Sequence, residues 1–88
     1  MCQEVKKIRK GIDKIDKKLK EFLGKREELV KEIGKLKKKY NLEIKDKNRE
    51  KEILSDIKSP FVKKVFKKII ESSKSLQSRL GLPEPNLI

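Results

Sequence analysis

Histidine and tryptophan are absent from this 88-residue chain, and cysteine occurs once, at Cys2. A single cysteine cannot form an internal disulfide, and without histidine a zinc or copper site lacks its usual ligands. The same absence excludes nucleophile systems that pair serine or cysteine with histidine. Any chemistry must therefore come from lysine, arginine, acidic, serine and glutamine side chains or from the backbone, and no metal site is expected.

Long apolar segments are also missing. No run approaches the ~20 residues that a membrane-spanning helix needs, and the N-terminus lacks the apolar block of a signal peptide. We therefore expect a cytoplasmic protein that makes no contact with a membrane. The charge is strongly one-sided, with 26 basic against 14 acidic residues and a net charge of +12. This excess predicts an anionic partner, which could be nucleic acid, an acidic membrane surface or a small polyanion.

Proline is absent before Pro60, and the apolar residues of the first forty positions recur at steps of three and four, as in a helical seam. The members of this seam are Val5, Ile8, Ile12, Ile15, Leu19, Phe22, Leu29, Ile33, Leu36 and Tyr40. They predict one helix over about residues 3–39, ~55 Å long. The rest of the chain is too short to cover such a rod. We therefore predict an all-α fold that forms an intertwined antiparallel homodimer, with a plain coiled coil or long helical hairpin as the alternative.

Two shorter helices are predicted after the rod, over about residues 47–58 and 60–79. Asp46 is a suitable N-cap for the first, and Ser59 followed by Pro60 is typical of a helix start. The sequence thus predicts one domain over residues 1–80 and a flexible tail over 81–88.

Arg26 interrupts the apolar seam of the first helix. A buried arginine needs an anionic neighbour, although it could instead fix helix register or extend to solvent. Lys37 follows eleven residues later on the same face, ~16 Å along the helix, so the two cations could hold a small dianion. Arg9 lies ~25 Å from Arg26, too far to join it within one chain. Two antiparallel rods that cross near residue 20 would bring the partner's Arg9 to that point, in two equivalent sites.

Polar residues also gather on the two shorter helices. Asp46, Arg49 and Glu50 lie at the start of the second helix, where capping and dipole compensation are the simple explanation. Glu50 precedes the inward apolar stripe and could accept a hydroxyl group. Ser73 and Gln77 are four residues apart and replace apolar residues on the inner face of the third helix. They are either two donors aimed into a polar cavity or a polar patch near a frayed end.

Four segments resemble, in order, the motifs of the all-helical chorismate mutases. They are IRKGIDKID at 8–16, KREELVKEIGKLK at 25–37, DKNRE at 46–50 and IIESSKSLQ at 69–77. The resemblance covers about residues 5–80. It implies a stand-alone, cofactor-free isomerase that rearranges chorismate to prephenate in phenylalanine and tyrosine biosynthesis.

The resemblance also implies a role for each matching residue. Arg26, Lys37 and Gln77 would be catalytic: Arg26 and the partner's Arg9 would hold the substrate carboxylates, and Lys37 would contact a carboxylate and the ether oxygen. Gln77 would donate a hydrogen bond to that same ether oxygen.

The remaining carried-over residues bind the substrate. Glu50 would take its ring hydroxyl, Asp46 and Arg49 would shape that end of the site, and Ser73 would lie near a carboxylate.

Three alternatives remain open on the sequence. An isochorismate–pyruvate lyase would use the same cationic clamp on an isomeric substrate. A basic helical module that binds nucleic acid would fit the net charge, but Phe22, Tyr40 and Phe66, three of only four aromatic residues, fall on apolar stripes. We therefore expect no nucleic-acid partner. A regulatory subunit of another enzyme is the third alternative, for which no sequence feature was found.

Overall fold

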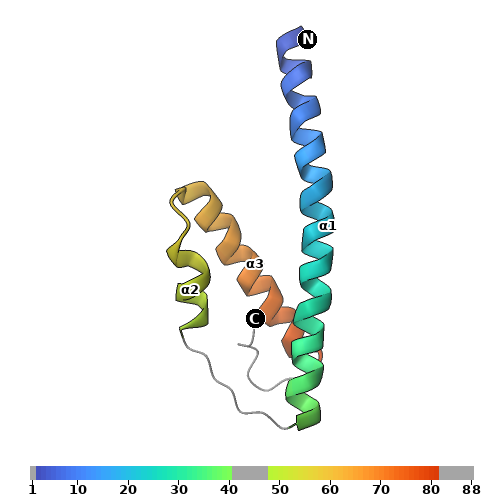
Figure 1. Cartoon of the computed structure of the whole chain (residues 1–88), viewed down its shortest axis with the longest axis vertical. Helices are drawn as coiled ribbons and strands as arrows, with labels where there is room; N and C mark the ends of the chain where they lie inside the picture. Colours follow the sequence, from blue (N-terminus) through green and yellow to red (C-terminus); the bar gives the residue numbers. More distant parts are fainter. Residues whose placement is uncertain (1, 41–47, 82–88) are drawn as a thin grey trace.

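The chain folds into three helices, seen in a computed structural model that describes residues 2–40 and 48–81 (Figure 1). They are α1 (Gln3–Tyr40), α2 (Arg49–Ser55) and α3 (Pro60–Arg79). α3 approaches the C-terminal half of α1 toward its own C-terminal end, and the short α2 lies along α3 (Figure 1). Within the described ranges every regular element is a helix, so the predicted all-α class is confirmed.

α1 is one continuous helix of 38 residues, close to the predicted range of about 3–39. Its buried residues, Val30, Gly34 and Lys37, all lie in the C-terminal half, at steps of four and three that place them on one face. The N-terminal half extends away from α2 and α3 (Figure 1). Its apolar residues are 41% to 65% exposed: Val5, Ile8, Ile12, Ile15 and Leu19. One half of α1 therefore packs within its own chain, and the other half does not.

α3 begins as the sequence predicts. The Ser59 hydroxyl accepts a hydrogen bond from the Val62 amide at 3.3 Å, and Pro60 occupies the first turn, where its missing N–H costs nothing. At the other end Gly81 has a φ of +84°, the left-handed conformation that glycine adopts most easily. Lys38 of α1 donates to the Leu80 carbonyl at 3.2 Å, which joins the ends of the two long helices.

α2 is shorter than predicted. It begins at Arg49 with Asn48 as its N-cap and ends at Ser55, whereas the sequence predicted a helix over 47–58 capped by Asp46. The Ser55 hydroxyl donates to the Glu52 carbonyl at 2.8 Å, and the Ile57 amide closes a tight turn on the Leu54 carbonyl at 3.2 Å. The residue before a proline is also biased to an extended backbone, so the helix cannot run on into Pro60.

Asp46 and residues 82–88 of the predicted tail lie outside the described residues.

The described residues bury few apolar side chains. Val30 and Ile70 are each 3% exposed, whereas Lys37, Ser73 and Gln77 are the buried polar ones. Among the described residues the buried side chains are thus more often polar than apolar, which is unusual because burying polar groups costs free energy unless they are hydrogen-bonded. None of α1, α2 and α3 is both long and apolar enough to cross a bilayer.

Candidate active site

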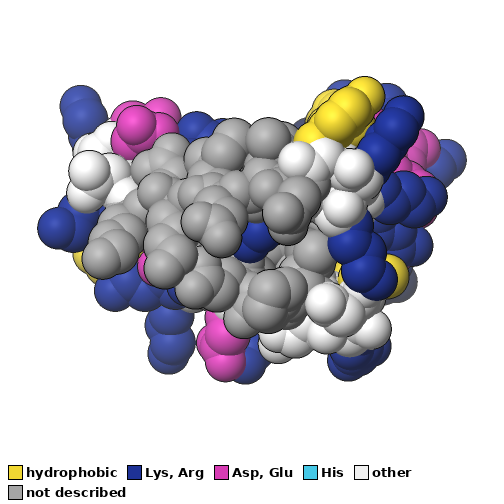
Figure 2. All heavy atoms as spheres, turned by 90° about the horizontal axis from the view of Figure 1, so that it is seen from below, with side chains coloured by type: hydrophobic (Ala, Val, Ile, Leu, Met, Phe, Trp, Pro, Cys, Tyr) yellow, Lys and Arg dark blue, Asp and Glu magenta, His cyan; other side chains and the backbone are white. Residues whose placement is uncertain are grey.

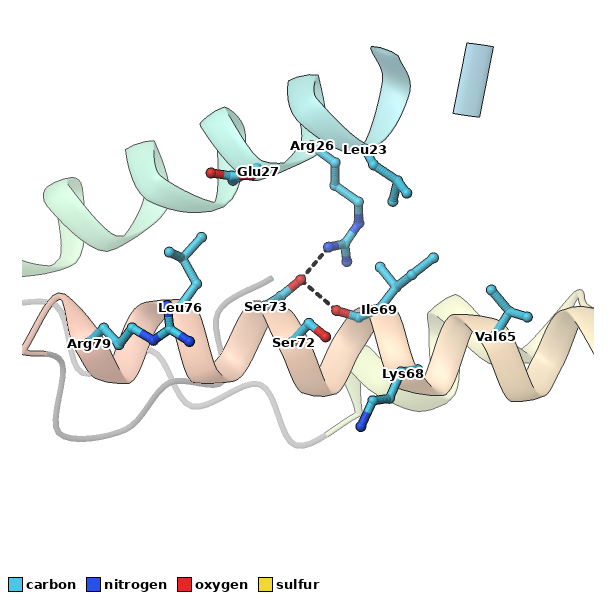
Figure 3. Close-up of a pocket in the computed structure, with 10 residues that line it drawn as sticks. All are labelled: Leu23, Arg26, Glu27, Val65, Lys68, Ile69, Ser72, Ser73, Leu76 and Arg79. Atoms are coloured by element: carbon cyan, nitrogen blue, oxygen red, sulfur yellow. Dashed lines mark hydrogen bonds between the residues drawn. The ribbon is translucent and has the colours of Figure 1, made fainter. Parts of the chain in front are cut away.

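A hydrogen bond between Arg26 and Ser73 joins α1 to α3. Arg26 Nη1 donates to Ser73 Oγ at 2.5 Å, and Ser73 Oγ donates to the Ile69 carbonyl at 2.8 Å (Figure 3). A hydroxyl has one proton to give, and here that proton goes to the backbone of α3. Ser73 therefore acts as an acceptor toward Arg26 and fixes the direction of the guanidinium.

A cavity of about 460 Å³ opens beside Arg26, between α1 and α3. In Figure 3, Arg26 and Leu23 extend from α1 toward α3, and Ile69 and Leu76 extend from α3 toward α1. The described residues that line the cavity are Leu23, Arg26, Glu27, Val65, Lys68, Ile69, Ser72, Ser73, Leu76 and Arg79. Lys37, Gln77 and Glu50 are not among them.

Lys37 and Gln77 lie on the buried faces of α1 and α3. Gln77 is fully buried, and Lys37 is 8% exposed. Lys37 lies seven residues after Val30 on α1, and Gln77 lies seven residues after Ile70 on α3, so both occupy positions that a simple helical bundle would fill with apolar residues. Lys37 and Arg26 lie on α1, and Gln77 and Ser73 lie on α3. Four of the predicted site residues therefore lie on two helices that contact each other.

The pKa of the Arg26 guanidinium is shifted by its surroundings. Burial lowers the pKa of Arg26, and the nearby positive charge of Arg49 lowers this pKa further. Both causes disfavour the charged form, yet an arginine stays protonated at neutral pH. An anion bound beside Arg26 would offset both effects. The site is therefore electrostatically suited to a negatively charged ligand, and Arg49 of α2 acts on it.

Glu50 contacts α3 rather than α1. Its Oε1 forms an ion pair with Lys74 Nζ, at a second cavity of about 210 Å³ between α2 and α3. The neighbouring Arg49 pairs with Glu52 at 3.3 Å within α2. Lys74 was not predicted from the sequence, because lysine is abundant throughout the chain. The signal that could have identified it is its place four residues after the buried Ile70, on the same side of α3.

Arg9 lies on the exposed N-terminal half of α1, away from the part that contacts α3 (Figure 1). Arg9 and Arg26 of the same chain lie ~25 Å apart along α1, so they cannot bind one small ligand together. Its assignment to the site depends on a second chain and stays a prediction, as does that of Asp46, which lies outside the described ranges. In residues 2–40 and 48–81 no cluster of three or more cysteine, aspartate or glutamate side chains could hold a metal ion.

Comparison with known proteins gives three similarities. A chorismate mutase from Methanocaldococcus jannaschii is 31% identical over an alignment 88 positions long, and the match covers 90% of this chain and 89% of that protein. A bifunctional chorismate mutase/prephenate dehydratase from Aquifex aeolicus is 44% identical over 55 residues, 62% of this chain but 15% of that longer protein. A solved structure, a conserved hypothetical protein from Pyrococcus furiosus, aligns with a TM-score of 0.75 at 42% identity, covering 88% of this chain and 99% of that one.

Residues 8–78 match the family described as chorismate mutase type II. The match spans α2 and most of α1 and α3, and it includes every predicted site residue. The resemblance noted on the four sequence motifs is confirmed, and with it the enzyme class. The chain belongs to the chorismate mutase type II family, whose members are isomerases.

Proposed function

We propose that this chain rearranges chorismate to prephenate as a homodimer with two equivalent sites. The observation that carries the proposal is the polar character of the buried faces of α1 and α3, where Lys37, Ser73 and Gln77 are protected from solvent and Ser73 accepts a hydrogen bond from Arg26. A structural bundle would gain stability from apolar residues there. Perturbed and buried polar groups that gather in this way are typical of functional sites.

To accelerate this reaction the protein needs only to bind the substrate in the reactive conformation and to stabilise the charge that develops. One C–O bond breaks while one C–C bond forms in the same molecule, so no atom leaves and no base or nucleophile is needed. The protein can hold the compact reactive conformer, which the free substrate rarely adopts. It can also place hydrogen-bond donors where the ether oxygen gains negative charge as its bond breaks.

The described residues can supply both effects. Arg26 would hold one carboxylate of the substrate together with the partner's Arg9. Lys37 would contact a carboxylate and the ether oxygen, to which Gln77 would also donate. A single preorganised donor of this kind contributes ~10²–10³ in rate.

Four further residues would shape the ends of the site. Ser73 gives its proton to Ile69, so its main contribution is to aim Arg26 at the carboxylate. Glu50 would accept the ring hydroxyl, and Arg49 would add positive charge near Arg26, in keeping with its effect on the Arg26 pKa. Asp46 would complete that end.

The exposed apolar seam supports a dimer. In the N-terminal half of α1 the side chains of Ile8, Ile12 and Ile15 are at least half exposed, and contiguous apolar surface of this kind marks a protein interface. Antiparallel packing of two such rods would cover the seam, and a two-fold axis would carry each Arg9 to the other chain's Arg26 and Lys37.

The charge of the protein supports an anionic substrate. Seen from the end at which α1 terminates, basic side chains lie around the edge of the described surface, with fewer acidic ones among them (Figure 2). With a net charge of +12, the chain would attract a dianion over a distance that salt shortens. We propose a cytoplasmic location for the enzyme.

The test is a direct absorbance assay of the purified protein with chorismate, with prephenate identified as the product. Lys37→Ala, purified in the same way, controls for a contaminating mutase. Isochorismate in a parallel assay would release pyruvate if the lyase alternative were correct. Absence of prephenate, with salt-dependent retention of the protein on DNA, would contradict the proposal and favour nucleic-acid binding.

A further inference from the structure

The ion pair between Glu50 and Lys74 joins the first turn of α2 to α3. Glu50 is the second residue of α2, and Lys74 lies between Ser73 and Gln77 in the sequence of α3. The two are 24 positions apart in the chain, so only the fold brings them together. Both side chains are partly exposed, at 38% for Lys74 and 41% for Glu50, which leaves the carboxylate accessible to a ligand.

α2 depends on this contact more than a longer helix would. It has seven residues, and none of them is buried. Its N-cap, Asn48, makes no side-chain capping hydrogen bond, and the Arg49–Glu52 pair lies within the helix and does not attach it to α3. The ion pair joins α2 to α3, and Leu54 of α2, which is half-buried, lines the second cavity together with Ile70 of α3. Apolar contacts set the distance between two packed helices, whereas an ion pair also sets the direction of the charged side chains that form it.

The carboxylate keeps capacity for a second partner. An ionised carboxylate has two oxygens and about four acceptor positions, and Lys74 occupies one of these at Oε1. A neutral hydroxyl can donate to the same group without displacing the lysine. The lysine also removes the disadvantage of placing a carboxylate near a dianionic substrate, because its positive charge offsets the repulsion.

We propose that Lys74 is a positioning residue that orients the Glu50 carboxylate toward the ring hydroxyl of the substrate. This inference rests on the proposed function and adds to it a residue that acts through Glu50 and does not touch the substrate. Its loss should weaken binding of the substrate more than it slows the chemical step.

The experiment is a double-mutant cycle on steady-state kinetics. The variants are Lys74→Gln, Glu50→Gln, the double variant and Lys74→Arg, with Lys64→Gln as the matched control. Lys64 is an exposed lysine on the same helix, so the control removes the same charge from α3 without touching the pair. Circular dichroism and solution mass identify any variant that loses its helices or its assembly.

We expect Lys74→Gln to lower kcat/KM about tenfold, mostly through KM, the size of effect typical for a charge-assisted hydrogen bond. Lys74→Arg keeps the cation and should recover most of this loss, and Lys64→Gln should match the wild type. In the Glu50→Gln background, Lys74→Gln should change kcat/KM less than about twofold, because the group it positions is already gone.

Two outcomes would overturn the inference. Wild-type kinetics for Lys74→Gln would show that the ion pair has no part in the reaction. An equal loss in both backgrounds would show that Lys74 acts on the substrate or the fold independently of Glu50. Failure of the proposed function is a separate result, since the wild-type protein would then form no prephenate and the cycle could not begin.

Discussion

The two halves of α1 carry the same spacing but different residues. From Ile8 to Leu19 the positions on one side of the helix are apolar and exposed. Seven residues after Leu19 the same side carries Arg26, and it continues to the buried Val30 and Lys37. One seam thus changes from apolar to cationic within a single helix. In the proposed dimer, one regular pattern would serve assembly in one half of α1 and ligand binding in the other.

The comparison also explains why the chain can bury polar residues. Within the described residues a single chain protects only Val30 and Ile70 among its apolar side chains, too few to stabilise a domain of this size. If the N-terminal halves supply the missing apolar burial through a partner, the C-terminal halves are free to hold Lys37 and Gln77. The stability of the protein and its activity would then come from different ends of one helix.

The largest expected effect comes from a substitution in the apolar seam of the N-terminal half of α1. Ile12→Glu would place a carboxylate in the proposed interface, where an unpaired charge is strongly destabilising. We expect the solution mass to fall to that of one chain, 10.4 kDa, or the helical signal to be lost. Turnover should fall by at least ~10²–10³, because the partner's Arg9 leaves both sites. Light scattering and circular dichroism measure the first effect, and the absorbance assay the second.

Lys17→Glu is the control for that experiment, since it places the same carboxylate on the opposite side of α1, at an exposed position, and changes the net charge by two where Ile12→Glu changes it by one. An Ile12→Glu protein that keeps the mass and activity of this control would remove the basis for the dimer.

The second effect comes from the cationic half. Lys37→Ala should lower kcat by ~10²–10³, equivalent to ~3–4 kcal/mol, because a donor to the ether oxygen is lost. The dimer should remain assembled, since the apolar half is unchanged. Lys35→Ala, at an exposed position two residues earlier, should have wild-type kinetics. Normal turnover in Lys37→Ala would contradict the assignment.

A third prediction separates donation from charge at the buried end of α3. The wild-type rate should be nearly flat between about pH 6 and about pH 9, because Gln77 has no proton to lose. The Gln77→Glu side chain can donate a hydrogen bond only while its carboxyl is protonated, that is, below its pKa, so its activity should rise as the pH falls. At about pH 8 its activity should be ~10²-fold lower than that of the wild type. Ser78→Glu, an exposed neighbour on α3, should keep the flat profile. Equal activity of Gln77→Glu at both ends of the range would exclude the donor role.

The smallest effect concerns the junction of the two helix ends. Lys38→Met removes the hydrogen bond to the Leu80 carbonyl, and the loss at an exposed position should lower the free energy of unfolding by about 0.5 kcal/mol. Turnover should not change. Urea unfolding against Lys35→Met measures the difference, and identical midpoints would mean that Lys38 does not stabilise the end of α3.

The long helices could be predicted from the sequence because their signals are local. The spacing of the apolar residues defines α1, and Ser59 with Pro60 defines the start of α3 through a hydrogen bond that spans three residues. The C-terminal end of α2 could not be predicted in the same way. It depends on the hydroxyl of Ser55, on the turn at Ile57 and on the extended backbone before Pro60, which compete with a weak helical preference.

The site divides along a similar line. Arg26, Ser73 and Gln77 could be predicted because each is a polar residue at an apolar position, and that contrast is visible without a structure. Lys74 has no such contrast in a chain with 26 basic residues, and its role depends on a contact made across 24 positions. The hydrogen bond by which Ser73 gives its proton to Ile69 was also beyond prediction, because it is decided by a side-chain rotamer.

The unbroken length of α1 has a consequence for how the protein can change. A continuous helix of 38 residues fixes both the distance and the angle between Arg9 and Arg26. One inserted residue between them would rotate Arg9 by about 100° relative to Arg26, and an inserted heptad would restore the angle to within about 20° but shift Arg9 by ~10.5 Å. In the proposed dimer, an insertion that preserves the apolar seam would still misplace the arginine, so the proposal requires this stretch to keep its length.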